Sequence, residues 1–180
     1  RLDFQRPLFL QQERRLTSAE RGTAMHLVMQ YLELGGPDPE EQVRRLTDRR
    51  LLTPQQAEAV DMERIRAFLA TPLAQEVRQA RQVWREYRFA LLMPAALYDP
   101  AAEGEELMLQ GVVDCAFRTE EGLVVVDFKT DRLAPGEEPQ RAEEYRPQLE
   151  AYAQALERVM EEKVCRKVLY FFSTGATINL

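Results

Sequence analysis

The sequence predicts a mixed α/β protein in which a β-hairpin lies at the centre of a sheet flanked by helices. Apolar runs with strand-like alternation occupy residues 83–93, 107–118 and 123–129. A long helical pattern follows from 141 to about 162, and a last apolar run covers 167–172. The order βββ–α–β, preceded by segments with helix-start signals, favours a mixed sheet with helices on its faces.

Helices are predicted for most of the first 80 residues, and threonine N-caps mark where they begin. Thr17 and Thr53 are each followed three residues later by Glu or Gln, which is the capping-box pattern. Thr71 precedes a proline that suits the first helical turn. The predicted helices run from Thr17 to the glycines at 35–36, over 39–52, over 54–70, and for a short stretch from residue 72. Residues 1–16 show no clear period, and we expect a packed extension or a linker there.

We expect one domain with two parts. Residues 1–80 form a helical N-terminal part, and residues 81–180 form the core sheet and its helix. Arg1 stands where a start Met would be, so we expect this segment to come from a longer chain.

Composition narrows the classes of protein that are possible. The 180-residue chain has a net charge of −6, which argues against a free-standing nucleic-acid binder. It contains no run of about 18 apolar residues and no signal peptide, so we expect a cytoplasmic protein without membrane contact. Its two cysteines sit in apolar contexts that suit a reducing compartment, and they cannot supply the four thiolates of an iron–sulfur cluster.

The predicted hairpin carries charges that an apolar strand does not normally hold. If residues 119–122 form a four-residue turn, Arg118 pairs with Leu123 and Asp114 lies opposite Asp127. Opposed Cβ atoms are about 4.5–5.5 Å apart, so two such carboxylates repel unless one is protonated or a cation bridges them. A three-residue turn would place them on opposite faces, so the hypothesis requires an even-length connection.

Asp127 and Lys129 are two residues apart on a strand and therefore share a face. Oxygen ligands with one possible imidazole suit Mg²⁺, or Mn²⁺, better than a structural zinc. Lys129 would then orient the attacking water, help to deprotonate it, or stabilise developing charge. The alternative is a surface salt bridge between Asp127 and Lys129 with no chemical role.

Four further residues have both a functional and a structural interpretation. His26, the single histidine, lies in the first helix one turn after a glycine, and it is either a ligand or part of the packing. Gln148 and Tyr152 are four apart on one helical face and would contact DNA or serve as ordinary surface and core residues. Glu86, expected to share a strand face with residues 84 and 88, is either an acid of the site or the ion-pair partner of a neighbouring arginine.

Together these residues form an ordered set. The segments that carry it are 22–26 (Gly-Thr-Ala-Met-His), 85–86 (Arg-Glu), 110–114 (Gln-Gly-Val-Val-Asp), 127–131 (Asp-Phe-Lys-Thr-Asp) and 145–152 (Tyr-Arg-Pro-Gln-Leu-Glu-Ala-Tyr). The set resembles the RecB-like branch of the PD-(D/E)XK nuclease superfamily, over nearly the whole chain. More narrowly, it is similar to the C-terminal nuclease domain of AddA-type helicase–nuclease subunits.

The resemblance implies a restriction-endonuclease-like fold and assigns roles to the residues of the set. It makes His26, Asp114, Asp127 and the backbone carbonyl of Phe128 the metal ligands, and it makes Lys129 the catalytic lysine beside the two aspartates. By the same likeness, Gln148 and Tyr152 contact DNA or support the site, and Glu86 matches a recurrent acidic position. The implied cofactor is Mg²⁺, with Mn²⁺ as a substitute and without an iron–sulfur cluster.

The function implied is that of a metal-dependent DNA exonuclease domain in an ATP-dependent helicase–nuclease, which processes double-strand breaks for recombinational repair in the bacterial cytoplasm. Its partners would be DNA, expected to be single-stranded, upstream helicase domains of the same chain, and a second helicase–nuclease subunit. No phosphate-binding loop of the Gly-x-x-x-x-Gly-Lys-Ser/Thr type is present, so we expect no ATPase activity in these residues. The alternatives are a free-standing RecB-like exonuclease and a non-catalytic module that binds DNA or protein.

Overall fold

The computed structural model describes residues 16–180, so the extension or linker predicted for the first 16 residues lies almost wholly outside the described part. The elements are α1 (Ser18–Tyr31), α2 (Pro39–Asp48), α3 (Pro54–Ala59), α4 (Met62–Leu69), α5 (Pro72–Gln79), β1 (Val83–Pro94), η2 (Ala95–Leu97), η3 (Pro100–Ala102), β2 (Glu106–Arg118), β3 (Leu123–Lys129), α6 (Glu138–Met160), β4 (Val164–Phe171) and β5 (Ala176–Asn179). Across residues 16–180, no helix combines the length and apolar character needed to cross a membrane.

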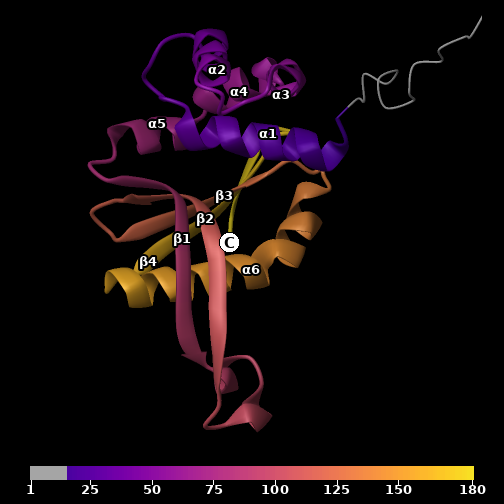
Figure 1. Cartoon of the computed structure of the whole chain (residues 1–180). Coiled ribbons are helices and arrows are strands. Elements are labelled where there is room, and N and C mark those ends of the chain that lie inside the picture. The colour runs from indigo at the N-terminus through magenta and orange to yellow at the C-terminus, as the bar shows by residue number, and fades with distance from the viewer. Residues whose placement is uncertain (1–15) are drawn as a thin grey trace, which may run out of the picture.

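The five strands form one mixed sheet in the order β1-β2-β3-β4-β5 (Figure 1). The first three strands are antiparallel neighbours, and α6 carries the chain across to β4, which runs parallel to β3. The short β5 closes the edge in antiparallel pairing, at a position where the sequence allowed either a tail or an edge strand. The predicted α/β class, the central hairpin and the order of the elements are confirmed.

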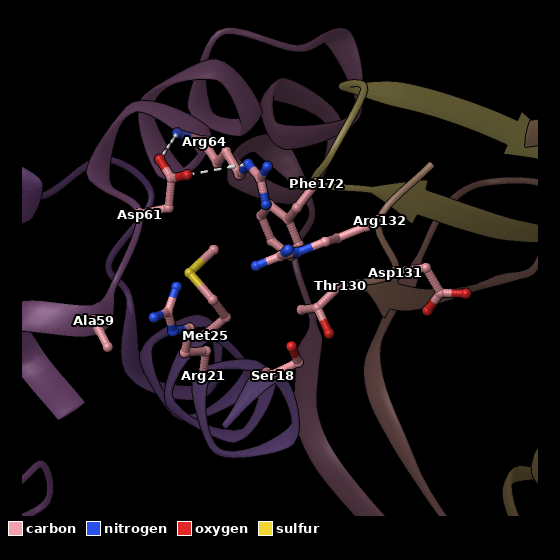
Figure 2. Close-up of a pocket in the computed structure, with 11 residues that line it drawn as sticks. Ser18, Arg21, Met25, Ala59, Asp61, Arg64, Thr130, Asp131, Arg132 and Phe172 are labelled. Atoms are coloured by element: carbon pink, nitrogen blue, oxygen red, sulfur yellow. Dashed lines mark hydrogen bonds and ion pairs between the residues drawn. The ribbon is translucent and has the colours of Figure 1, made fainter. Parts of the chain in front are cut away.

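Helices cover both faces of the sheet. The helices α1–α5 gather on one face, and α6 crosses the other, while the β1–β2 hairpin projects beyond them (Figure 1). The segment after β3 returns beside the N-terminal half of α1, where Ser18 and Thr130 border a cleft (Figure 2). The end of β3 is therefore the place where the two helical layers and the sheet meet.

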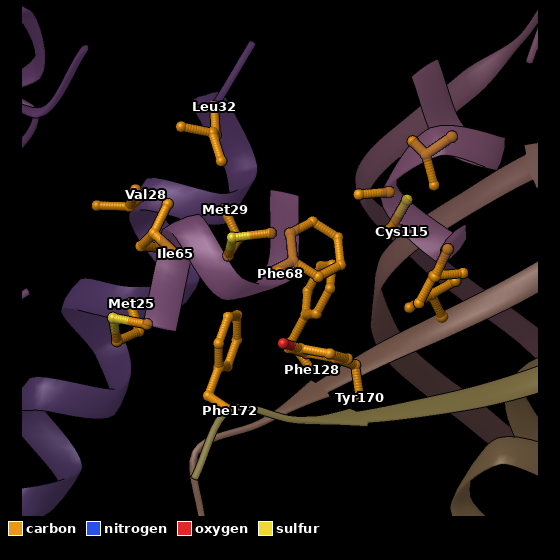
Figure 3. Packing of buried hydrophobic residues seen from close by; sticks show 14 of the residues in the cluster. Met25, Val28, Met29, Leu32, Ile65, Phe68, Cys115, Phe128, Tyr170 and Phe172 are labelled. Atoms are coloured by element: carbon orange, nitrogen blue, oxygen red, sulfur yellow. The ribbon is translucent and has the colours of Figure 1, made fainter. Parts of the chain in front are cut away.

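Alternate residues of β3 belong to different hydrophobic clusters. Phe128 turns its ring toward the α1–α5 side, where it packs with Phe68, Tyr170 and Phe172 (Figure 3). Val125 faces the opposite cluster, which includes residues of α6. Because strand side chains alternate, Asp127 and Lys129 follow Val125 onto the α6 side.

The predicted helix caps are present. Thr17 and Thr53 both form reciprocal capping boxes with residues Glu20 and Gln56, and the Thr71 hydroxyl accepts a hydrogen bond from Ala74 N. These local signals place the starts of α1, α3 and α5 at their predicted positions.

Three helix boundaries differ from the prediction. The helix expected over 54–70 is two helices, because Val60 is extended and the Asp61 side chain caps a new helix at Arg64 N. The second helix ends at Asp48, four residues early, since the chain passes through a left-handed conformation shortly afterwards. Helix α6 begins at Glu138 within a stretch expected to be loop, because a proline is accommodated in a first helical turn.

The connection between β2 and β3 has the predicted even length. Arg118 pairs with Leu123 across a four-residue turn, and Thr119 N donates to Gly122 O at 2.9 Å. Gly122 has a φ of 136°, and a Cβ there would lie 2.5 Å from the carbonyl oxygen of Lys163. Only glycine therefore suits the turn that sets the register of the hairpin.

We predict that Gly122→Ala lowers the free energy of unfolding by about 2–4 kcal/mol, since it adds backbone strain and a clash with a main-chain oxygen. Gly136→Ala is the matched control, because Gly136 also has a positive φ of 97° but a methyl group there would meet no atom within 4 Å. The control should cost only about 1 kcal/mol. Urea unfolding measures both, and equal costs would show that the contact with Lys163 does not matter.

Candidate active site at the end of the central hairpin

The ladder between β2 and β3 stops where the two aspartates stand. Its last backbone pair is Cys115 with Val126. One step further, Phe128 N donates to the Oδ2 atom of Asp114 at 2.8 Å, so a side chain takes the place of a backbone acceptor. Asp114 and Asp127 keep the opposed register positions that the four-residue turn predicts, but the strands separate there.

The neighbouring pair of strands is irregular at the same level. Arg85 pairs with Cys115 and Tyr87 pairs with Val113, while Glu86 and Asp114 stand opposite each other without pairing. Glu86 has a φ of 51°, a conformation that costs a non-glycine residue about 1–3 kcal/mol. The irregularity brings two acidic residues to the same register position.

This irregularity corrects the prediction for Glu86. Regular alternation placed Glu86 on a face with Trp84 and Arg88, but Tyr87, rather than Arg88, follows Trp84 into the cluster on the α6 side. The nearest cation is Arg88, whose Nη2 atom lies 3.9 Å from Glu86 Oε1 with the arginine largely exposed. Such a contact contributes little stability.

His26 reaches the hairpin from α1. Its Nε2 atom lies 2.8 Å from the Phe128 carbonyl oxygen, 102 residues away in sequence, and 3.3 Å from Asp114 Oδ2. Its Nδ1 atom lies 2.9 Å from the Gly22 carbonyl oxygen. A Cβ on Gly22 would be 2.8 Å from Thr130 Oγ1, so the glycine lets α1 lie against the chain just beyond β3.

The surroundings of His26 favour a protonated ring. Burial alone lowers the pKa of His26, but the hydrogen bond and charge of Asp114, with the carbonyls of Gly22 and Phe128, outweigh it and raise the pKa to about 9. Because both carbonyls only accept, each ring nitrogen must carry a proton for both bonds to form. The imidazolium therefore supplies a positive charge beside the aspartates.

Asp127 is the most deeply buried acid of the site, with 5% of its surface exposed. Burial and the nearby Asp114 raise the pKa of Asp127 to about 6, against the opposing charges of Lys129 and His26. Lys129 Nζ lies 2.5 Å from Asp127 Oδ2, an ion pair without hydrogen-bond geometry. The Oδ2 atom is thus a buried oxygen whose hydrogen-bonding capacity is unused among the described residues.

Helix α6 holds Lys129 from the other side. Lys129 Nζ donates to Gln148 Oε1 at 3.0 Å, and Gln148 Nε2 donates to the Tyr152 hydroxyl at 2.9 Å. The ammonium also lies 3.7 Å from the centre of the Tyr145 ring, and the Tyr145 hydroxyl donates to Asp131. Sequence reasoning assigned no role to Tyr145, although its position one turn before Gln148 was the available signal.

The donor atoms suit a hard divalent cation. An imidazole nitrogen, carboxylate oxygens and a backbone carbonyl are ligands that Mg²⁺ and Mn²⁺ accept. In the conformation described for residues 16–180, no three His, Cys, Asp or Glu side chains converge on one point. The convergence is instead of His26, Asp114 and the Phe128 carbonyl, with the unused Oδ2 atom of Asp127 nearby.

Arg85 fixes α1, and therefore His26, against the sheet. Its Nη1 atom donates to the carbonyl oxygens of Met29 at 2.9 Å and Leu32 at 2.6 Å, which lie at the C-terminal end of α1. These carbonyls have no partner within the helix, and a cation suits that end of the helix dipole. Burial lowers the pKa of Arg85.

We predict that Arg85→Met reduces the free energy of unfolding by about 1–3 kcal/mol, because it leaves partly buried carbonyls without a donor. Amide hydrogen exchange should quicken in α1 before it quickens in the sheet. Arg88→Met, at an exposed position of the same strand, is the control and should change neither measurement appreciably. Unchanged exchange in α1 of the Arg85 variant would contradict this role.

A carboxylate pair and a lysine at the end of a central hairpin, on a mixed sheet between helical layers, define a nuclease-type fold. The sequence matches the family model of the PD-(D/E)XK nuclease superfamily over residues 2–178. The chain belongs to the PD-(D/E)XK nuclease superfamily, as the motif set indicated.

Curated relatives narrow the relationship to proteins named as the ATP-dependent helicase/nuclease subunit that is designated A. The protein of Acetivibrio thermocellus is 44% identical over 179 residues, covering 97% of this chain and 14% of its own length. That of Heliobacterium modesticaldum is 40% identical over 186 residues, covering 97% of this chain and 13% of its own length. That of Bacillus velezensis is 37% identical over 190 residues, covering 98% of this chain and 15% of its own length. The chain therefore spans a small fraction of these relatives, and the predicted likeness to AddA-type subunits is confirmed.

Proposed function

We propose that this chain is a metal-dependent deoxyribonuclease domain that hydrolyses phosphodiester bonds in single-stranded DNA. The observation that carries the proposal is the meeting of His26, Asp114, Asp127 and Lys129 at one end of the hairpin. A surface salt bridge does not account for this arrangement, because Asp127 is buried and its carboxylate stands beside a second one.

In the proposed site, Asp114, Asp127, His26 and the Phe128 carbonyl would hold Mg²⁺, for which Mn²⁺ is a chemically similar substitute. The bound ion would polarise the phosphodiester and lower the pKa of a water molecule. His26 would bind through Nε2, which requires loss of the proton that it holds toward Asp114 and Phe128. The Gly22 carbonyl would keep the proton on Nδ1 and thereby orient the ring.

Lys129 would stabilise the negative charge that develops on the phosphate, or orient the attacking water. Gln148 and the Tyr145 ring restrict its ammonium group, so little rotational freedom remains to be lost during the reaction. Gln148 and Tyr152 would extend the site along α6 toward the DNA backbone, or support Lys129 from behind. Glu86, across from Asp114, would be a further acid of the site.

We propose that the domain acts inside an ATP-dependent helicase–nuclease of the bacterial cytoplasm, during the processing of double-strand breaks for recombinational repair. The names of the relatives support this context over a free-standing exonuclease. Helicase domains of the same chain would deliver a single strand, together with a second helicase–nuclease subunit. Residues 1–80 and 81–180 would act as one domain in which the helical part contributes His26.

We predict that Asp127→Asn lowers Mg²⁺-dependent cleavage of single-stranded DNA by at least about a thousandfold, corresponding to about 4 kcal/mol of transition-state stabilisation. The same change should preserve or raise thermal stability without metal, since burial already disfavours the charged carboxylate. Asp48→Asn, at an exposed position of α2, is the control and should leave cleavage unchanged. Full activity in the Asp127 variant would refute the proposed mechanism.

Mg²⁺ titration by calorimetry separates a nuclease from a non-catalytic module that binds DNA or protein. We predict that the unsubstituted chain binds Mg²⁺ and that Asp114→Asn weakens binding at least about tenfold, because even supporting residues of metal sites have effects of that size. Asp48→Asn should bind as the unsubstituted chain does. Binding that survives the Asp114 change would place the ion elsewhere.

A further inference from the structure

A polar cleft adjoins the candidate active site on the α1 side. It has a volume of about 430 Å³ and lies between α1, α4 and the segment that follows β3 (Figure 2). Thr130 and Asp131, which directly follow Lys129, form one wall. Gly22, whose carbonyl contacts His26, forms part of the opposite wall. The cleft therefore continues from the site and is not an isolated surface feature.

Three arginines and two aspartates line this cleft, but their charges do not cancel. Asp61 is occupied by Arg64, whose Nε atom lies 3.1 Å away. Asp131 accepts hydrogen bonds from Arg141 at 2.6 Å and from a tyrosine, both of which belong to α6. The acids of the cleft are thus already engaged.

Arg21 and Arg132 are the uncompensated charges. Neither forms an ion pair with any residue in the described part of the chain, and both are exposed. Figure 2 shows the guanidinium groups of Arg21, Arg64 and Arg132 directed into the space between α1 and Thr130. A local excess of positive charge in a chain of net charge −6 is not a consequence of composition.

The chemistry of the cleft suits phosphate groups. A guanidinium presents a planar pair of donors that matches phosphate oxygens, and hydroxyl groups are common additional donors to a nucleic-acid backbone. Ser18 and Thr130 supply hydroxyls on opposite walls (Figure 2). The apolar contribution is small, with Met25 and Phe172 at the base. An uncharged organic ligand would leave the arginines without partners.

The position of the cleft relates it to the reacting phosphodiester. Arg21 precedes His26 by five residues on α1, which corresponds to about 7.5 Å along the helix axis. Arg132 lies three residues beyond Lys129. A volume of about 430 Å³ is typical of a small-ligand pocket, so the cleft admits part of one strand rather than a duplex with a major groove about 12 Å wide.

We propose that this cleft binds the sugar–phosphate backbone of single-stranded DNA immediately beside the phosphodiester at the hairpin site, with Arg21 and Arg132 as its phosphate contacts. The inference rests on the proposed deoxyribonuclease function and adds the path of the strand. Arg64, held by Asp61, completes the wall between them.

The test measures binding of a fluorescent single-stranded oligothymidylate by anisotropy, in EDTA so that no cleavage occurs, over a range of salt concentrations. Each phosphate contact on a single strand contributes about 0.7 to the slope of log affinity against log salt. The double variant Arg21→Gln/Arg132→Gln should therefore lose about 1.4 from that slope, and each single variant about half as much.

The control is Arg44→Gln/Arg49→Gln, which removes the same charge from exposed positions in and directly after α2. It should retain the slope of the unsubstituted chain, and all variants should retain its thermal melting temperature because the four arginines are exposed. Equal losses in both double variants, an unchanged slope in the Arg21/Arg132 variant, or absence of binding by the unsubstituted chain would each overturn the proposal.

Cleavage assays with Mg²⁺ separate this inference from the function on which it rests. A chain that binds DNA through Arg21 and Arg132 but never cleaves it would refute the nuclease proposal and retain the cleft. A chain that cleaves DNA, with affinity and salt slope indifferent to both arginines, would retain the nuclease proposal and refute the cleft.

Discussion

The hydrogen bond from Phe128 N to the Asp114 carboxylate is the interaction on which the site depends. It ends the β2–β3 ladder one residue short of the two aspartates and leaves the Phe128 carbonyl available to His26. Two carboxylates at such an end of a buried strand repel each other and lose hydration. The positive charges of His26 and Lys129 offset this cost in the described conformation, and a divalent cation would offset it more completely.

The site is assembled from both faces of the sheet, which explains why a short hairpin needs such extensive support. Helix α1 brings His26 to one side, and Arg85 fixes that helix through its last carbonyls. Helix α6 holds Lys129 on the other side through Gln148. Phe128 couples the two, because its ring packs into the aromatic cluster while its carbonyl faces the imidazole. A shift of either helix would change the distance between the catalytic and ligand atoms.

The charge distribution also has a spatial logic. The chain as a whole is acidic, yet the cleft beside the site carries arginines whose acidic neighbours are engaged elsewhere. A domain that receives its DNA from a larger assembly does not need a positive overall charge to capture the substrate from solution. Local positive charge suffices to hold a strand already delivered, and it avoids nonspecific binding by the rest of the surface.

Local signals in the sequence determined much of this protein: the capping threonines, the strand periodicity, and the four-residue turn that sets the register of Asp114 and Asp127. They succeed because caps and turns depend on neighbouring residues. The motif resemblance added His26, which periodicity alone could not join to residues 102 positions away. Only the tertiary structure decided the break at Val60, the strained backbone of Glu86, and the roles of Arg85 and Tyr145. Each of these depends on contacts between distant segments, and such contacts leave no periodic signal in the chain.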